Sequence, residues 1–454
     1  MFKLKTIDAT SGRLLPSILI YAVPLILATL VQTLFHAVDL IVLRYTADSV
    51  AIASVGATGT ITTLIVHTFI GLSGGTNVIL ARFIGAKDHK NIHDTTSTSI
   101  LMSIAIGMIA SILGLIFSEP LLILTKCPAD CFDGALTYLR IYFLSTPAIL
   151  LYSFGASILR TSGDTTRPLI YMLLSGSLNL VMNIVLCFVL KEKVAAVAIA
   201  TLASQVLGAV LTMVRLCTMK GDCRISLLKM RFSVPLFRRI LRFGLPICLN
   251  TALFPIANLQ IQSAINSFGS AATAGNVASI NLENFVSSVT TAFGTSALTF
   301  IGQNLGAGKP DRVRKSFRLC LSISFLCGLV LGLVLYSFGD FFLSFFVGND
   351  SDAIGYGMIR ARYILVFHCI AALNSGFGAT LNAFGYSAFT SLVSIIAVFG
   401  LRLVWMNFIY PFFPTFECVF VCFFVSWILM FLCNIIMIAI VFRKYKNGTL
   451  HSVS

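Results

Sequence analysis

The sequence predicts an all-α integral membrane protein with twelve transmembrane helices in two pseudo-symmetric six-helix lobes. Of its 454 residues, 57% are hydrophobic and only 11% are charged, and the mean hydropathy is +0.94. A soluble domain is roughly a quarter charged, so the bilayer must cover most of this apolar surface. A series of long apolar stretches and an internal repeat complete the prediction.

Twelve apolar stretches are each long enough to cross ~30 Å of hydrocarbon. The expected spans are 16–43, 52–81, 97–117, 136–158, 168–190, 194–216, 243–268, 274–301, 317–338, 358–382, 388–410 and 418–442. The first apolar run lacks the short core and small-residue cleavage site of a signal peptide. We therefore expect it to be a retained helix.

Charge is distributed unevenly between the two sides of these spans. With the N-terminus inside, 24 of the 32 Lys and Arg fall on the cytoplasmic side and seven outside, Arg360 among them, while Arg402 lies within a span. This asymmetry predicts a plasma-membrane protein with both termini cytoplasmic. The net charge of +15 is thus explained by loops facing the cytoplasm, and no nucleic-acid partner is expected.

The second half of the chain repeats the first with an offset of 221 or 222 residues. The matching pairs are Gly85–Gly306, Tyr142–Tyr363, Gly155–Gly376, Pro24–Pro246 and Gly163–Gly385. The expected organisation is an N-terminal lobe at 1–217, a basic cytoplasmic linker at 218–238 and a C-terminal lobe at 239–454. Because six is even, the copies are parallel repeats, a scaffold typical of alternating access, although some channels also carry repeats.

The repeat includes the turn "IGQNLGAGKPDRVRKS" at 301–316. Gly306 and Gly308 permit a tight turn there, and Pro310 suits the first position of the next helix. The basic residues that follow are expected to hold the turn at the anionic inner leaflet. A phosphate-binding loop is excluded because the glycine spacing is wrong and no Ser or Thr follows the lysine.

Three motifs together resemble the multidrug and toxic compound extrusion (MATE) family. They are "GQNLGAGKPDRVRKS" after one apolar helix, "ILRTSGDTTRPLI" after another and "HAVDLIVL" in the first helix. The resemblance covers nearly the whole chain. It implies a two-lobe antiporter with a cavity between the lobes, which exports bulky, often cationic organic compounds in exchange for H⁺ or Na⁺.

Acidic residues inside the membrane are costly and usually functional. Asp39, in the first helix, matches the acid that the resemblance marks as the ion-coupling site. His36 lies three residues earlier on the same face and could relay protons or hydrogen-bond the acid. Pro24 can kink this helix, and Pro246 is its counterpart in the second half, so both are candidate hinges.

Amides and a hydroxyl complete the predicted N-terminal coupling site. Asn179 and Asn183 lie four residues apart on one helix face, and Thr201 matches the family's hydroxyl on the sixth helix. The family usually has Asp-Pro where this chain has Cys187 and Phe188. With one acid rather than two, a tight Na⁺ site is disfavoured, and coupling to H⁺ is preferred.

The C-terminal half offers candidate cargo or second coupling residues. Glu283 could neutralise a cationic cargo, or it could pair with Arg402 or neighbouring amides. The seventh helix contains Asn258, Gln262 and the candidate hinge Pro255. Its amides either line a cavity or join helices.

Other functional classes fit less well. No HExxH or GxSxG motif is present, so an enzyme is not expected. The twelve cysteines follow no zinc or redox spacing, so no metal site or cofactor beyond the coupling ion is expected, and a Cys127–Cys131 disulfide is left open. The alternative function is a lipid-linked oligosaccharide flippase of the same architecture, which should show a more cationic cavity than one arginine against two acids provides. We expect a monomer whose partners are small organic cations and the bilayer.

Overall fold

The structure is a computed structural model that describes residues 6–46, 49–125 and 127–448. It describes the side chains of these residues except at 33–46, 49, 52, 229, 254–257 and 259. The described part of the chain is almost entirely helical and contains no strand. The predicted all-α membrane architecture is confirmed.

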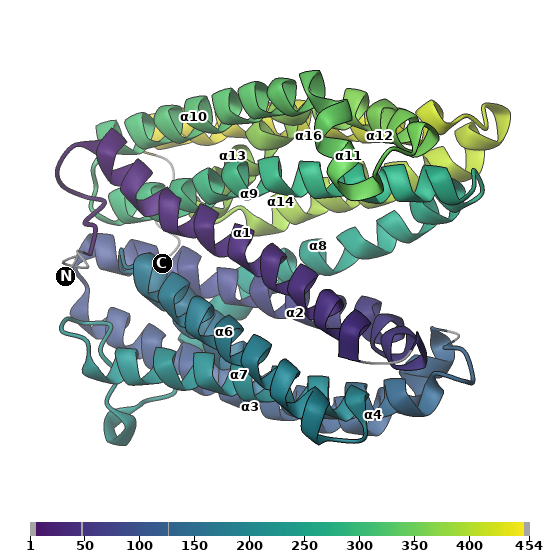
Figure 1. The fold of residues 1–454 in the computed structure, drawn as a ribbon. Helices are drawn as coiled ribbons and strands as arrows, with labels where there is room; N and C mark the ends of the chain where they lie inside the picture. The colour runs from purple at the N-terminus through teal and green to yellow at the C-terminus, as the bar shows by residue number, and fades with distance from the viewer. Residues whose placement is uncertain (1–5, 47–48, 126, 449–454) are drawn as a thin grey trace. The chain divides into compact units, whose positions relative to one another are not determined.

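The first half consists of seven helices (Figure 1). They are α1 Leu14–Thr46, α2 Ser49–Ala86, α3 His89–Leu124, α4 Phe132–Leu144, α5 Thr146–Thr161, α6 Thr166–Val189 and α7 Lys193–Thr218. Helices α4 and α5 meet at an angle of 45° and form one bent span. The expected single span at 136–158 is therefore broken at Ser145.

The second half repeats this order after a short turn, η1 Leu227–Lys229. Its long helices are α8 Val234–Asn266, α9 Ser270–Gly306, α10 Pro310–Ser337 and α16 Phe416–Lys446. Its shorter helices are α11 Gly339–Val347, α12 Ser351–Ile364, α13 His368–Ala383, α14 Ser387–Ser394 and α15 Leu401–Val404. Here α12 and α13 form the bent span, at 47°, so the expected span at 358–382 is also broken.

The span that contains α14 and α15 is irregular. Two π-helical segments, η2 Ile395–Gly400 and η3 Trp405–Ile409, flank α15, and a 3₁₀ turn, η4 Tyr410–Phe412, ends the span. Its counterpart in the first half, α6, is a regular helix. Such π segments occur often at functional sites. These two flank α15, which contains Arg402.

The number of membrane crossings follows from length and apolarity. Within the described residues, nine helical segments can cross a membrane, and the two bent pairs bring the number to eleven. Helix α8 has 33 residues, enough to extend about 50 Å at 1.5 Å per residue. The repeat makes α8 the counterpart of α1, which predicts it to be the sixth span of the second half.

Contacts divide the chain into two compact units. Unit 1 is the chain up to Asp8 together with Val23–Cys248, and unit 2 is Ala9–Ala22 together with the chain from Leu249 onward. The first turns of α1 therefore belong to unit 2, and the first turns of α8 belong to unit 1. Each of these two helices passes from one unit to the other.

The core of each unit forms around the second half of its bent span. In unit 1, α5 packs against α2, α3 and α7, and in unit 2, α13 packs against α9, α10 and α16. Glycines allow the close approach: a Cβ on Gly107 of α3 would lie 2.6 Å from the Cα of Pro147 in α5. The helices of the two repeats thus have matching neighbours.

The predicted turn at 301–316 is present, with one correction. Gly308 has a φ of +64°, and α10 begins at Pro310, as expected. The bases do not all face the bilayer, however, because Lys309 Nζ donates to the carbonyl of Thr10 and Arg312 donates to the carbonyls of Ala9, Ser11 and Gly12. Carbonyls of an irregular segment need donors, and these two side chains supply them.

Candidate functional site

The predicted coupling acid lies on α1, which runs from Leu14 to Thr46. Asp39 and His36 are within this helix, but their side chains lie outside the described residues. The same holds for Pro255 in α8. Asp39 belongs to the part of α1 that is assigned to unit 1.

The two asparagines of α6 come together as predicted from their spacing. Asn183 is 1% exposed, and its Nδ2 donates to Oδ1 of Asn179, which is also buried, at 3.1 Å. Buried amides need partners in an apolar environment, and this pair supplies one. The bond joins two polar side chains one turn apart on α6.

Thr201 is on α7, which packs against α6. Its hydroxyl donates to the carbonyl of Val197 in the same helix at 3.0 Å. A threonine in a helix often makes this bond to the preceding turn. The structure thus unites the two asparagines through a side-chain bond, whereas Thr201 bonds its own backbone.

The main polar cluster of unit 2 contains an ion pair between a buried arginine and a partly buried glutamate that the sequence did not predict. Arg360 of α12 is 4% exposed, and its Nη2 binds Oε2 of Glu283 in α9. Its Nη1 donates to Oδ1 of Asn276 at 3.1 Å. Arg360 was counted among the residues outside the membrane, but it is on a helix, α12, that packs against α9 and buries this side chain. Glu283 pairs with this arginine rather than with Arg402.

Amides of α8 extend this cluster. Nδ2 of Asn276 donates to Oε1 of Gln262 at 3.3 Å, and Nε2 of Gln262 donates to Oδ1 of Asn266 at 2.8 Å. Nη1 of Arg402 donates to Oδ1 of Asn258 at 2.9 Å. Both predicted amides, Asn258 and Gln262, thus bind groups on other side chains of the cluster.

Aromatic rings on α16 lie against both arginines. The Cζ atom of Arg402 is 3.9 Å from the ring centroid of Phe423, and that of Arg360 is 5.8 Å from the same ring. Arg402 itself is only 1% exposed. Cation–π contact is strong when a guanidinium is desolvated, so Phe423 stabilises two charges that the hydrocarbon would otherwise disfavour.

His368, at the start of α13, is a further buried group. Its Nε2 is 3.4 Å from Oγ of Ser287, and its ring packs edge-on against Trp427 with a centroid distance of 6.2 Å. The sequence showed only an isolated histidine. In the sequence, the only sign of its role was that His368 is a polar residue inside an apolar span.

The candidate hinges Pro24 and Pro246 lie close to the division between the units. Unit 1 begins in α1 at Val23 and ends in α8 at Cys248, within two residues of each proline. A proline removes one backbone hydrogen bond and allows a helix to bend. Both helices can therefore bend near the point where they leave one unit.

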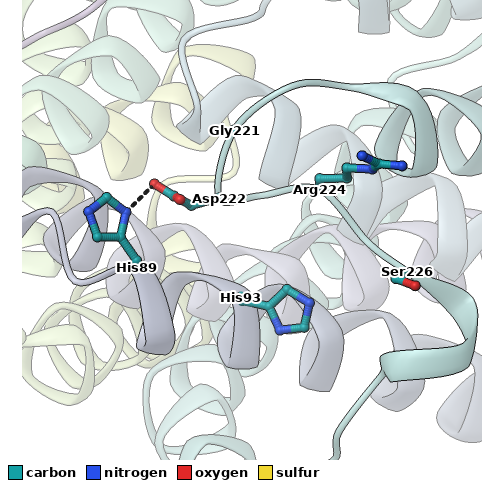
Figure 2. A pocket seen from close by; sticks show the side chains of 6 residues that line it. All are labelled: His89, His93, Gly221, Asp222, Arg224 and Ser226. Carbon is teal, nitrogen blue, oxygen red and sulfur yellow. Dashed lines mark ion pairs between the residues drawn. The ribbon is translucent and has the colours of Figure 1, made fainter.

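A surface pocket in unit 1 lies between the start of α3 and the chain that follows α7 (Figure 2). It is lined by His89, His93, Gly221, Asp222, Arg224 and Ser226, and Nδ1 of His89 is 2.7 Å from Oδ2 of Asp222. Next to it, burial raises the pKa of the Cys223 thiol to about 12. Among the described residues, no group of three or more His, Cys, Asp or Glu could hold a metal ion.

The family model MatE matches residues 24–189 and 246–408. The chain belongs to the MatE family. The two matched segments begin at Pro24 and Pro246, so the family model recognises each copy of the repeat separately. This confirms the family that the three motifs suggested, and it makes the chain a multi-pass membrane transporter.

Individual relatives are distant but cover most of the chain. The chain is 24% identical over 394 residues to a probable multidrug resistance protein, YoeA, of Bacillus subtilis, covering 85% of each. It is 26% identical over 326 residues to an FAD transporter of Shewanella oneidensis, covering 70% of this chain and 71% of that one. A crystal structure of MATE in complex with MaL6 matches with a TM-score of 0.88 at 20% identity, over 97% of this chain and 99% of the other.

Proposed function

We propose that the chain is a secondary antiporter that exports bulky organic compounds in exchange for H⁺ or Na⁺, with H⁺ preferred. The observation that carries the proposal is the match of both halves to one transporter family, on a scaffold of two repeated six-span units. Such parallel repeats suit alternating access by rocking about a fixed site. The named relatives favour export of organic compounds over the flipping of lipid-linked oligosaccharides.

In this proposal Asp39 is the ion-coupling residue. A carboxyl group in an apolar environment binds a proton more readily than in water, and its protonation changes the charge on α1. The amide pair Asn179–Asn183 provides polar groups within the same unit, with Thr201 on α7 as a further candidate. Position 187 is Cys instead of the family's second acid, which favours H⁺ over Na⁺.

The energetics allow a single ion to drive export. One charge crossing a potential of ~100 mV is worth about 2.3 kcal/mol, which sustains a roughly fifty-fold gradient of a neutral cargo. No cofactor beyond the coupling ion is needed. We place the protein as a monomer in the plasma membrane with both termini in the cytoplasm, in line with the distribution of Lys and Arg.

Organic cations are the first candidate cargo, since multidrug resistance proteins are among the relatives. A second candidate is cargo that carries an anionic group. In the polar cluster of unit 2, Glu283 lies with two buried arginines, Arg360 and Arg402. One relative is an FAD transporter. The preference for cations rested partly on counting one intramembrane arginine, and that count is now two.

Transport in proteoliposomes tests the proposal. Purified protein is reconstituted, and export of a cationic dye and of an anionic dye is measured under an imposed pH gradient and, separately, a Na⁺ gradient. We expect the pH gradient to drive export of the cationic dye. Asn183→Ala and Thr201→Ala should each slow it, with the larger effect at Asn183 because that side chain is the more deeply buried. If neither gradient drives export of either dye, the antiport proposal is rejected.

A further inference from the structure

The chain from the end of α7 through the first turns of α8 is strongly basic. Residues 219–242 contain seven Lys or Arg and one acid, Asp222. The basic residues are Lys220, Arg224, Lys229, Arg231, Arg238, Arg239 and Arg242. Because this segment joins two helices of a membrane protein, both of its ends lie near a membrane surface.

The first part of this segment is fixed to unit 1. Cys223 and Ile225 are buried, and the N–H of Ile225 donates to the carbonyl of Leu216 at 2.9 Å. Nε of Arg224 donates to the carbonyl of Cys217 at 3.1 Å. Figure 2 shows this part running across the start of α3, where Asp222 meets His89.

The second part, residues 226–234, turns apolar side chains outward, and we refer to it as the linker knuckle. Leu228 is 99% exposed and Leu227 is 65% exposed, and Phe232 and Val234 are also exposed. The far end is held as well, because the N–H of Ser233 donates to Oγ1 of Thr98 at 3.1 Å. The knuckle is therefore held by hydrogen bonds on both sides, while Leu228 is almost fully exposed and Leu227 is about two-thirds exposed.

The first turns of α8 continue this surface with positive charge. Leu236, Ile240 and Phe243 are buried in unit 1, whereas Arg238 and Arg242, four residues apart, are exposed. Arg231 in the knuckle is exposed too. Exposed leucines beside a row of bases are typical of a segment that lies in the interface of an anionic membrane.

We propose that the linker knuckle inserts Leu227 and Leu228 into the membrane interface and that the flanking arginines bind anionic phospholipid headgroups. Water is a poor environment for two adjacent exposed leucines, and a lipid surface accommodates both the leucines and the charges. The positions next to spanning helices place this surface within reach. The proposal does not depend on the cargo or on the coupling ion.

Lipid contact is measured on the full-length protein in nanodiscs. Leu228→Trp is compared with Lys90→Trp, an exposed position at the start of α3 without exposed apolar neighbours. Added fluorescence is taken as the difference from the parent protein, which contains Trp405 and Trp427. The nanodiscs contain phosphatidylglycerol brominated near the headgroup end of its acyl chains. We expect the tryptophan in Leu228→Trp to be quenched several-fold more strongly than that in Lys90→Trp and to have a blue-shifted emission.

Charge dependence separates anionic lipid from general apolar contact. In phosphatidylcholine nanodiscs, quenching of Leu228→Trp should fall, and the triple variant Arg231→Gln, Arg238→Gln, Arg242→Gln should abolish the difference between the two lipids. Equal quenching in both lipids without these substitutions would overturn the headgroup assignment. Quenching no greater than that of Lys90→Trp would overturn membrane insertion altogether. Neither result bears on transport, so the outcome is independent of the antiport proposal.

Discussion

The two halves of the chain share a scaffold but place their charges differently. Their bent spans have nearly the same angle, 45° and 47°, and the paired glycines Gly163 and Gly385 have φ values of +90° and +85°. In the second half, the partly buried Glu283 forms an ion pair with the buried Arg360. With the offset of 221, the same positions in the first half are Thr62 and Leu139.

The reverse exchange occurs on the first helix of each half. Asp39 of α1 corresponds, with the offset of 222, to Ile261 of α8, which is buried in an apolar cluster. Leu139 likewise lies in an apolar cluster of unit 1, with Ile61 and Phe143. The two copies of the repeat therefore share their packing, and each carries charged residues at positions where the other is uncharged. We infer that the two halves have different roles, and that ion coupling depends on Asp39 in the first half.

Breaking the ion pair of the second half should have the largest effect on stability. Arg360→Leu leaves Glu283 as an uncompensated charge, and we expect a loss of roughly 3–5 kcal/mol of unfolding free energy. The double variant Glu283→Thr, Arg360→Leu copies the first half and should recover most of that loss. The stability of both variants is measured by thermal denaturation of the detergent-solubilised protein, with size-exclusion chromatography used to monitor unfolding.

Arg362→Leu is the matched control, because Arg362 is two residues away and exposed. Its effect should stay within about 0.5 kcal/mol. A double variant as unstable as Arg360→Leu would show that the second half cannot accept the apolar pairing of the first. The two halves would then differ in packing as well as in charge.

Matching glycine contacts, between α3 and α5 in unit 1 and between α10 and α13 in unit 2, give a smaller, graded comparison. A Cβ on Gly107 would lie 2.6 Å from Cα of Pro147, whereas one on Gly328, its counterpart, would lie 3.1 Å from Cβ of Ala372 and 3.2 Å from Cα of Cys369. Gly107→Ala must move backbone and should cost about 1–3 kcal/mol. Gly328→Ala should be close to neutral, because a small shift and a helix-propensity gain of ~1 kcal/mol offset each other. Equal melting temperatures for the two variants would contradict this packing.

The turns after α2 and α9 differ at one left-handed position. Lys87 has a φ of +55°, and its counterpart Gly308 has a φ of +64°. A side chain at such an angle costs ~1–2 kcal/mol, so Lys87→Gly should stabilise the protein by up to ~1 kcal/mol. Gly308→Lys should destabilise it by a similar amount. A fall in melting temperature for Lys87→Gly would argue that the lysine side chain compensates for its backbone.

Much of the fold could be predicted because the repeat and the apolar runs are long-range features of the sequence. The bent spans were not predicted. Pro147, in the first turn of α5, was an available signal for the break at Ser145, whereas the residues around Leu365 are apolar and no such signal marks that break. Arg360 was missed because residues near a span end are assigned to loops. Its helical spacing with the buried Gly357 and Ile364 was the available signal, for it places the arginine on the inward face of α12.

The site was predictable only in part. Asn179 and Asn183 were paired from their spacing, and they do bond to each other. The partner of Glu283 was not predicted, because Arg360 is 77 residues away in the sequence and only tertiary packing brings the two together. The stacking of Phe423 on Arg402 is equally non-local, and no pattern singled out one of the 38 phenylalanines.

Ion-driven dye export in proteoliposomes, compared between Asp39→Asn and the double variant Glu283→Thr, Arg360→Leu, tests the division between the halves most directly. We predict that Asp39→Asn abolishes export driven by the ion gradient while the protein stays folded, as judged by size-exclusion chromatography. We predict that the double variant still exports the dye under the same gradient. Gradient-driven export by Asp39→Asn at the parental rate, or its loss only in the double variant, would contradict the assignment of coupling to the first half.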